Sequence, residues 1–225
     1  MKHIVFLTGA GISAESGIST FRDSNGLWEN YDVEKVASIN GWYENPSLVN
    51  KFYNERRKQL ETVEPNEAHK LIAELEKAYK VTVVTQNVDN LHERAGSTNI
   101  IHLHGELTKV CNEKKTVINN IGTKPIIDGT LAEDGSLLRP FIVWFGEAVP
   151  LIDKAVEIIQ TADILVIVGT SLNVYPAAGL VNYAINSEKV YIIDPKDVKV
   201  PKNFHFIKEK AGAGMQIFIN NLESL

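Results

Sequence analysis

The chain lacks the features that mark several protein classes. Its single cysteine, Cys111, excludes an internal disulfide framework and leaves no four-cysteine zinc site. No stretch reaches the roughly 18 apolar residues that a membrane span needs, and one early lysine before an apolar run does not make a signal peptide. The net charge is −5, and the only basic cluster is Arg56-Arg57-Lys58. We therefore expect a cytoplasmic protein that binds neither membranes nor nucleic acid.

What the chain does contain is a phosphate-binding pattern near its start. The apolar run Ile4 to Leu7 predicts a buried strand, and Gly9 and Gly11 follow it directly. Glycine permits positive φ and close backbone approach, and a helix that begins there offers free backbone amides to a pyrophosphate. The residues from Gly9 to Ala14 fit the dinucleotide fingerprint G-x-G-x-x-A, which is a weak signal on its own.

The sequence after this pattern departs from that of a dehydrogenase. A dehydrogenase continues into a second strand with an acidic residue about 20 positions on. Here residues 16–28 are polar and rich in glycine, and the next strong strand signal is Val81 to Thr85. A plain dehydrogenase is therefore disfavoured, and a site that remodels the dinucleotide is favoured.

The rest of the chain alternates between strand and helix patterns. Helices are predicted within Asp32–Val63, where Pro46 marks a start, and at Glu67–Tyr79 after the cap Asn66, and at Ile152–Thr161. Strands are predicted at Val81–Thr85, around His102 and His104, at Arg139–Phe145, Asp163–Val168 and Val190–Ile193, whereas residues 108–138 show no regular pattern. The alternation predicts an α/β fold, a doubly wound parallel Rossmann-like sheet with a small inserted lobe.

Polar residues follow several of these strands, where ligands bind in open α/β sheets. Gln86, Asn87 and Asp89 come after one strand, and together such groups can bind a carboxamide and ribose hydroxyls. Alternation over residues 101–104 places His102 and His104 on one face of a short strand. The pair suggests one functional imidazole; the alternative is a structural core histidine.

These motifs together resemble one family, the sirtuins, which are NAD-dependent protein-lysine deacylases. The motifs occur in the family's order: Gly9-Ala-Gly11-Ile-Ser13, Gly17-Ile-Ser-Thr-Phe21-Arg22-Asp23, Thr85-Gln86-Asn87-Val-Asp89-Asn-Leu-His92, His104-Gly105, Phe145-Gly146-Glu147 and Gly169-Thr170-Ser171. The resemblance spans nearly the whole chain. It implies a single catalytic domain, with a Rossmann-like part over 1–31, 64–107 and 139–225 and a small lobe over 32–63 and 108–138.

The resemblance also implies the roles of individual residues. His104 is implied as the general base and Asn87 as its catalytic partner in the nicotinamide pocket. The implied NAD-binding residues are Gly9, Ala10, Gly11, Phe21, Arg22, Asp23, Gln86, Asn87, Asp89, Gly169, Thr170, Ser171, Asp194 and Ala211. Asp194 stands where the family usually has asparagine. Val143, Phe145, Gly146 and Glu147 are implied to bind an acyl-lysine peptide, which adds as a strand between residues 143–147 and 173–175.

The expected acyl group depends on a predicted helical segment whose composition alone indicates an exposed surface. Tyr53 and Arg56 are three residues apart, so they share one face of a helix, and the plain interpretation is a solvated face. In class III sirtuins a Tyr-x-x-Arg pair binds the carboxylate of succinyl- or malonyl-lysine, and a small residue widens the pocket. Tyr53 and Arg56 match the pair, and Ala37 matches the small residue. The expected products are free lysine, nicotinamide and O-acyl-ADP-ribose, with acetyl-lysine still accepted.

The family's zinc module is the large departure. Lys114, Leu131 and Asp134 stand where three of its four cysteines belong, so we expect no zinc. The lobe must then either be held by packing or be mobile, with five apolar residues as candidates for the packing: Val117, Ile118, Ile121, Ile126 and Ile127.

Three other functions stay open at this point. They are a sirtuin-like NAD hydrolase or ADP-ribosyltransferase, a non-catalytic NAD-sensing module, and, least favoured, a dehydrogenase. For the deacylase we expect NAD as the cofactor, acyl-lysine proteins or peptides as substrates, and a monomer.

Overall fold

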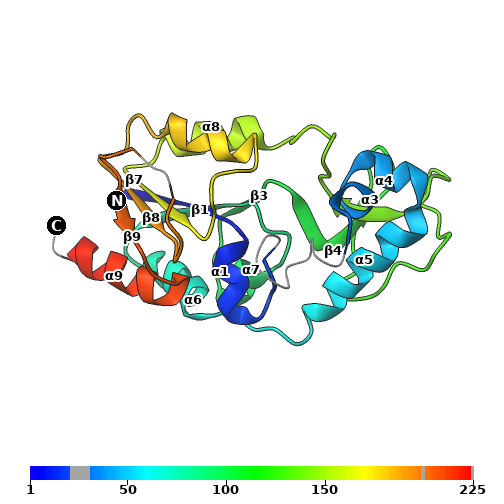
Figure 1. Cartoon of the computed structure of the whole chain (residues 1–225), viewed down its shortest axis with the longest axis horizontal. Helices are drawn as coiled ribbons and strands as arrows, with labels where there is room; N and C mark the ends of the chain where they lie inside the picture. The colour runs from blue at the N-terminus through cyan, green and yellow to red at the C-terminus, as the bar shows by residue number, and fades with distance from the viewer. Residues whose placement is uncertain (21–30, 199–200, 224–225) are drawn as a thin grey trace.

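The computed structural model describes residues 1–20, 31–198 and 201–223. These residues form two sheets. The larger sheet and its helices occupy one end of the elongated molecule, and the smaller sheet lies with α3 (Val33–Val36), α4 (Ile39–Glu44) and α5 (Pro46–Gln59) at the other (Figure 1).

The larger sheet has six strands in the order β3-β2-β1-β7-β8-β9, and every neighbouring pair is parallel. The strands are β1 His3–Thr8, β2 Lys80–Thr85, β3 Ile100–His102, β7 Ile164–Val168, β8 Lys189–Ile193 and β9 His205–Ile207. The direction of winding reverses between β1 and β7, which is the switch point where ligands bind in such sheets. This order confirms the doubly wound parallel sheet predicted from the sequence.

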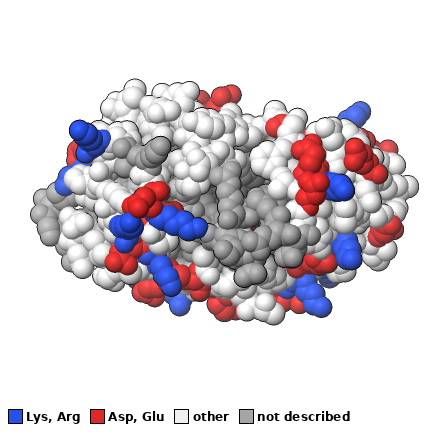
Figure 2. Space-filling view, viewed as in Figure 1, with Lys and Arg blue, Asp and Glu red and all other residues white. Residues whose placement is uncertain are grey.

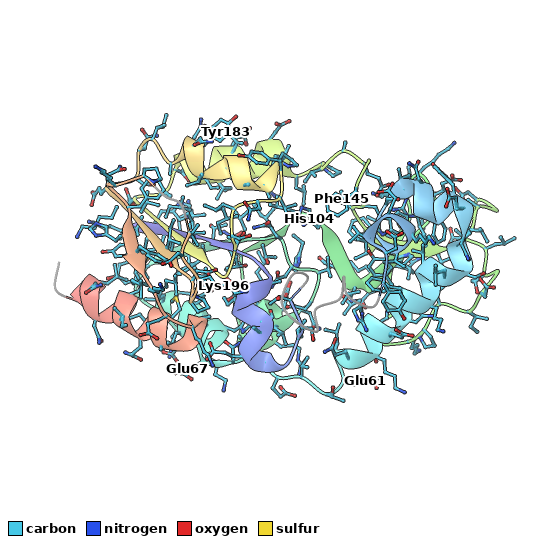
Figure 3. The ribbon with its side chains drawn as sticks, in the orientation of Figure 1. Glu61, Glu67, His104, Phe145, Tyr183 and Lys196 are labelled. Atoms are coloured by element: carbon cyan, nitrogen blue, oxygen red, sulfur yellow. The ribbon has the colours of Figure 1, made fainter. Side chains whose placement is uncertain are left out.

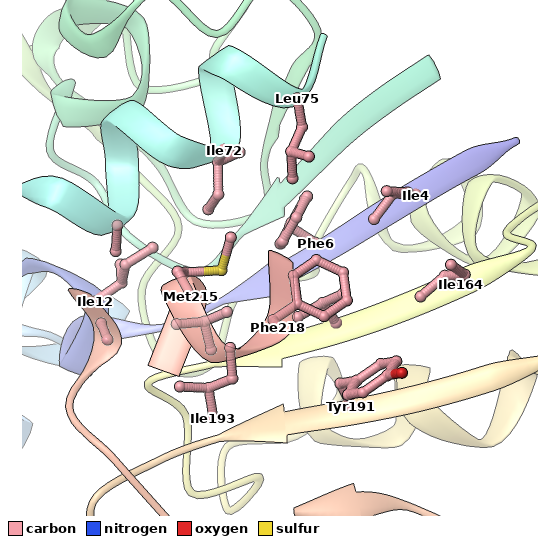
Figure 4. Close-up of a cluster of buried hydrophobic side chains, with 14 of the residues drawn as sticks. Ile4, Phe6, Ile12, Ile72, Leu75, Ile164, Tyr191, Ile193, Met215 and Phe218 are labelled. Carbon is pink, nitrogen blue, oxygen red and sulfur yellow. The ribbon is translucent and has the colours of Figure 1, made fainter. Parts of the chain in front are cut away.

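Helices cover both faces of this sheet because successive side chains of a strand point to opposite faces. In the fully buried β1, Ile4 and Phe6 pack with α6 and α9, whereas Val5 and Leu7 pack with α8 and η2. Figure 4 shows the first of these clusters, in which the ring of Phe218 lies beside β1. The elements are α6 Glu67–Leu75, α8 Ile152–Gln160, η2 Ala177–Tyr183 and α9 Ala211–Glu223.

The smaller sheet differs from the sequence prediction. It consists of β4 (Gly105–Cys111), β5 (Ile118–Asn120) and β6 (Arg139–Ile142), antiparallel in the order β5-β4-β6. The segment from Arg139 was expected in the main sheet, and 108–138 was expected to lack strands; both expectations are wrong. β3 also ends at His102, so His104 lies in the following turn rather than on the same strand face.

The helical segment before Val63 divides into three helices at capping residues. Ser38 Oγ accepts a hydrogen bond from the amide of Gly41, and Asn45 Oδ1 accepts one from Leu48, with Pro46 in the first turn of α5. The core of this lobe is aromatic, and Trp42 stacks on Trp144 with ring centroids 5.3 Å apart. In the main part, α6 begins after Asn66 as predicted but ends at Leu75, four residues earlier than predicted.

The region of the missing cysteines is held by polar contacts as well as by packing. Asn112 is 2% exposed, and its Oδ1 accepts from the amides of Thr116 and Val117. Its Nδ2 donates to Thr116 Oγ1 at 2.8 Å and to Asp134 Oδ2 at 2.7 Å, which joins the two turns. Of the five apolar candidates only Ile126 is buried, while Ile118 and Ile127 are 45% and 75% exposed, so most of these residues were the wrong candidates for the packing.

Candidate functional site

The glycines at the switch point bring two backbone segments into contact. The amide of Gly9 donates to Val168 O at 3.0 Å, and that of Gly11 donates to Gly169 O at 2.8 Å. A β-carbon on Gly11 would lie 2.7 Å from Gly169 Cα, and Gly169 has φ +63°, so side chains are excluded here. This close packing of glycines, called here the glycine cradle, places the start of α1 (Ala10–Ser13) beside the end of β7, at the switch point where a dinucleotide binds in such sheets.

The residues expected around the adenosine half lie at the ends of β7 and β8. Ser171 is exposed, and Asp194 directly follows β8 and accepts from the amide of Lys196 at 2.8 Å. Ala211 is buried at the start of α9, where Glu15 Oε2 accepts from the amide of Gly212 at 2.8 Å. This contact fixes the position of α9 against the segment that follows the glycine cradle.

Gln86 joins three strand ends. Its amide N–H donates to Thr8 O at 2.9 Å, and its Nε2 donates to Thr170 Oγ1 at 3.1 Å. The backbone of Gln86 is therefore joined to the end of β1 and its side chain to the residue that follows Gly169 after β7, beside the glycine cradle. The resemblance to the family implies a contact of Gln86 with the ribose of NAD, and this contact stays a prediction.

Asn87 and Asp89 belong to one buried hydrogen-bonded chain. Asn87 Nδ2 donates to Ser13 Oγ at 3.1 Å, and Ser13 Oγ donates to Asp89 Oδ2 at 3.0 Å. Burial raises the pKa of the Asp89 carboxyl, although Leu91 N and Ser13 donate to it. Because Ser13 fixes the amide nitrogen of Asn87, the amide oxygen is available to a ligand. Ser13 was not expected as a site residue; its position in the glycine motif was the available signal.

His104 has one ring nitrogen occupied and one available. Its Nδ1 lies 3.0 Å from Gln86 O, and a carbonyl only accepts, so Nδ1 carries the proton and Nε2 the lone pair. Burial lowers the pKa of the ring, which keeps it neutral and able to take a proton. Figure 3 shows His104 and Phe145 between the main sheet and the small lobe; the amide of Val143 donates to His104 O at 2.9 Å.

His102 contacts the backbone carbonyl of Asn87, the residue that follows Gln86. Its Nδ1 lies 3.1 Å from Asn87 O, and its Nε2 lies 2.6 Å from Glu93 Oε1. Burial lowers the pKa of His102, but the hydrogen bond and charge of Glu93 more than offset this, and the pKa is raised overall. An imidazolium therefore anchors Asn87. Glu93 was missed from the sequence because its contact depends on the path of the loop and α7 (Leu91–Ala95).

Tyr53 is buried in the small lobe, which rules out the solvated-face interpretation for this residue, whereas the Arg56 side chain is 21% exposed and its Nη2 lies 3.8 Å from Glu55 Oε2. Tyr53 is 6% exposed, and its Oη accepts from Trp144 Nε1 at 3.0 Å. Burial raises the pKa of Tyr53, so the hydroxyl keeps its proton. Arg56 stacks over the ring of Phe52 at 5.0 Å, and its Nε and Nη1 are buried without a hydrogen-bond partner.

In residues 143–147, where a substrate peptide is expected to pair, several backbone groups are already hydrogen-bonded within the protein. The amide of Phe145 donates to Ala37 O at 2.9 Å, and Phe145 O accepts from Ile39 at 3.0 Å, so this segment pairs with the start of α4. Ala37 is buried, whereas Phe145 and Gly146 are exposed, with Gly146 at φ +88°. A peptide strand can pair here only through the groups that remain.

The Glu147 carboxylate is engaged within the protein. It accepts from Arg139 Nη1 and Nη2, each at 3.0 Å, from Lys115 Nζ at 2.9 Å and from the amide of Trp144 at 2.9 Å. Burial raises its pKa, but these partners more than offset that and lower it overall. The geometry gives Glu147 a role in fixing the turn, and contact with substrate stays a prediction.

The remaining predictions concern three NAD-binding residues, metal binding, membrane spans and Cys111. Phe21, Arg22 and Asp23 lie outside the described residues. Within the described ranges, no group of three or more His, Cys, Asp or Glu could hold a metal ion, and no helix is long and apolar enough to cross a bilayer. Cys111 is fully buried, which raises the pKa of its thiol to about 11. Acidic and basic side chains are intermixed over the face in Figure 2.

The fold and the glycine cradle define a dinucleotide-binding α/β protein of the doubly wound class. The profile of the Sir2 family matches residues 9–176. An "NAD-dependent protein deacylase" of Bacteroides thetaiotaomicron is 56% identical over 224 residues and covers 96% of both chains. The chain therefore belongs to the Sir2 family, the sirtuins.

Solved structures of the family share the whole architecture. A Sir2 homologue in complex with NAD has a TM-score of 0.90 and 38% identity, covering 99% of this chain and 90% of that one. A mutant Sir2 homologue in complex with ADP-ribose has a TM-score of 0.92 and 37% identity, covering 99% and 92%. These likenesses agree with the NAD cofactor expected from the sequence.

Proposed function

We propose that this chain is an NAD-dependent protein-lysine deacylase that removes succinyl and malonyl groups in preference to acetyl. The observation that carries the acyl preference is Arg56, whose Nε and Nη1 are buried without a partner. The third donor group, Nη2, lies 3.8 Å from Glu55 Oε2. Two buried donor groups without acceptors are nevertheless costly, and a carboxylate matches the planar donors of a guanidinium. The free carboxylate of a succinyl or malonyl group supplies that partner, and an acetyl group does not.

Two further residues, Tyr53 and Ala37, support the same substrate. Tyr53 keeps its proton and can donate it to the carboxylate. Ala37 supplies a small side chain at the family's pocket-widening position, and its carbonyl accepts from Phe145 of the peptide-facing segment. A charge-assisted hydrogen bond contributes about 1.5–3 kcal/mol, enough to set the order of two acyl groups.

The reaction uses residues of the main sheet. NAD, when bound, supplies the ribose that accepts the acyl group after nicotinamide leaves. His104 Nε2 carries the lone pair that accepts a proton from a ribose hydroxyl, and Gln86 O holds its ring in that tautomer. Asn87, fixed by Ser13 and His102, offers its amide oxygen to the carboxamide. The acyl-lysine is held against His104 by the segment after β6, so proximity replaces a strong nucleophile.

One experiment distinguishes the deacylase from an NAD hydrolase and from an NAD sensor. One peptide carrying acetyl-, malonyl- or succinyl-lysine is incubated with the protein and NAD, and mass spectrometry scores free lysine and O-acyl-ADP-ribose. We expect both products, with the acidic acyl groups removed faster. NAD consumption without acyl product would favour the hydrolase. Intact NAD that still binds, with His104→Ala unchanged from the wild type, would favour the sensor.

The monomeric state and the cytoplasmic location also stay proposals. They rest on the sequence alone, as does the expectation that the small lobe works without zinc.

A further inference from the structure

Trp144 is held by several contacts in the core of the small lobe. It is 2% exposed, and its indole stacks on Trp42 at an interplanar angle of 28°. The Arg139 guanidinium lies 3.7 Å from the ring centroid on account of its own ion pair with Glu147, and the backbone amide of Trp144 donates to the same carboxylate. These contacts leave the indole little freedom to rotate.

This fixed indole determines how the Tyr53 hydroxyl is used. An indole Nε1–H only donates, so Tyr53 Oη must be the acceptor in their 3.0 Å hydrogen bond. The proton of Tyr53 then has to point elsewhere, and no acceptor for it lies among the residues that the structure describes. Arg56 follows Tyr53 by three residues on α5, so the two side chains share one face of that helix.

We propose that Trp144 is a positioning residue for acidic acyl groups: its indole N–H holds Tyr53 Oη so that the tyrosine proton is presented to the acyl carboxylate beside Arg56. The proposal rests on the proposed acyl preference and adds a residue whose buried indole acts through Tyr53. Without the indole N–H, the hydroxyl can rotate and must be ordered when the substrate binds, which weakens binding.

The test compares Trp144→Phe with Trp42→Phe. Both changes replace an indole by a phenyl ring in the same buried stack, but only Trp144 contacts Tyr53 Oη. Steady-state kinetics are measured with succinyl- and acetyl-lysine forms of one peptide at saturating NAD. For Trp144→Phe we expect KM for the succinyl peptide to rise roughly 3- to 10-fold, the range for one neutral hydrogen bond, while the acetyl peptide changes less than about 2-fold. Trp42→Phe should change both peptides by equal factors.

A double-mutant cycle separates positioning from packing. In a Tyr53→Phe background, Trp144→Phe should cause no further selective loss on the succinyl peptide, because the hydroxyl is already absent. Equal effects of Trp144→Phe on both peptides would overturn the positioning role alone. A wild-type enzyme that does not prefer the succinyl peptide would overturn the proposed acyl preference and this inference with it.

A spectroscopic measurement covers the case in which Trp144→Phe does not fold. In a ¹H–¹⁵N spectrum the Trp144 indole signal is one of three, and Tyr53→Phe should move it upfield while the Trp42 signal stays in place. An unchanged Trp144 indole signal would contradict the hydrogen bond and the proposal.

Discussion

Asn112→Ala is the perturbation that tests how the small lobe is held together without the family's zinc module. The Asn112 side chain makes four hydrogen bonds, two to backbone amides and two to Thr116 Oγ1 and Asp134 Oδ2. Alanine removes all four and leaves the amides of Thr116 and Val117 without their acceptor. Between the turn that follows β4 and the turn around Asp134, the hydrogen bond from the amide of Glu113 to Ser136 Oγ at 3.2 Å then remains, without the one from Asn112 to Asp134.

The size of the effect follows from these partners. A hydrogen bond contributes about 1 kcal/mol net, and a donor left unsatisfied in a buried place costs about 1–3 kcal/mol. Thr116 and Asp134 are exposed, so water replaces part of what they lose. We therefore expect Asn112→Ala to lower the free energy of unfolding by about 2–4 kcal/mol.

Urea unfolding followed by tryptophan fluorescence measures this loss, because Trp42 and Trp144 lie in the core of the small lobe. Asn120→Ala on the exposed β5 is the control, since its side chain accepts only from the amide of Gly122. EDTA should leave the wild-type transition unchanged. A loss below about 0.5 kcal/mol for Asn112→Ala, or a clear destabilisation by EDTA, would refute the reasoning.

Three further predictions concern the main sheet. His104→Ala should abolish deacylation, while calorimetry should show that NAD binding is retained. Because burial lowers the pKa of His104, the acid limb of the pH profile of kcat for the wild type should lie below pH 6.5. Gly11→Ala should weaken NAD binding at least about 10-fold by titration, because the new β-carbon meets Gly169 Cα. Glu93→Gln should lower the free energy of unfolding most between pH 4.5 and 6.5. The pKa of His102 is raised, so the stability that the His102–Glu93 ion pair contributes is lost as the pH rises through that pKa; the pKa of Glu93 is lowered, so the same contribution is lost as the pH falls through that pKa. A loss of stability that does not depend on pH in urea titrations would count against the ion pair.

The parallel sheet could be predicted because its strands are buried on both faces. β1 and β7 are continuous apolar runs of the kind that only a covered sheet requires, and glycines follow both. The small antiparallel sheet could not be found in this way. All three residues of β5 are exposed, and β4 alternates irregularly, so their pairing depends on contacts that periodicity does not report.

The candidate site, too, could be predicted from the sequence only in part. The polar residues after β2 were predicted as a group because strand ends share one edge of a sheet. Their mutual arrangement was not, since Ser13 and Asn87 are 74 positions apart. Tyr53 and Arg56 were assigned through resemblance, whereas Trp144 lies 91 positions from Tyr53, and no spacing rule connects them.

The ratio of kcat/KM for succinyl- and acetyl-lysine forms of one peptide, measured for the wild type, Arg56→Met and Lys58→Met, tests the central claim most directly. Lys58 is the matched control because it is an exposed cation on the same helix. We expect the wild type and Lys58→Met to prefer the succinyl peptide, and Arg56→Met to reverse the order after losing roughly 10- to 100-fold on that peptide alone. A wild-type preference for acetyl, or a ratio that Arg56→Met leaves unchanged, would contradict the claim that the Arg56 guanidinium selects the acyl group.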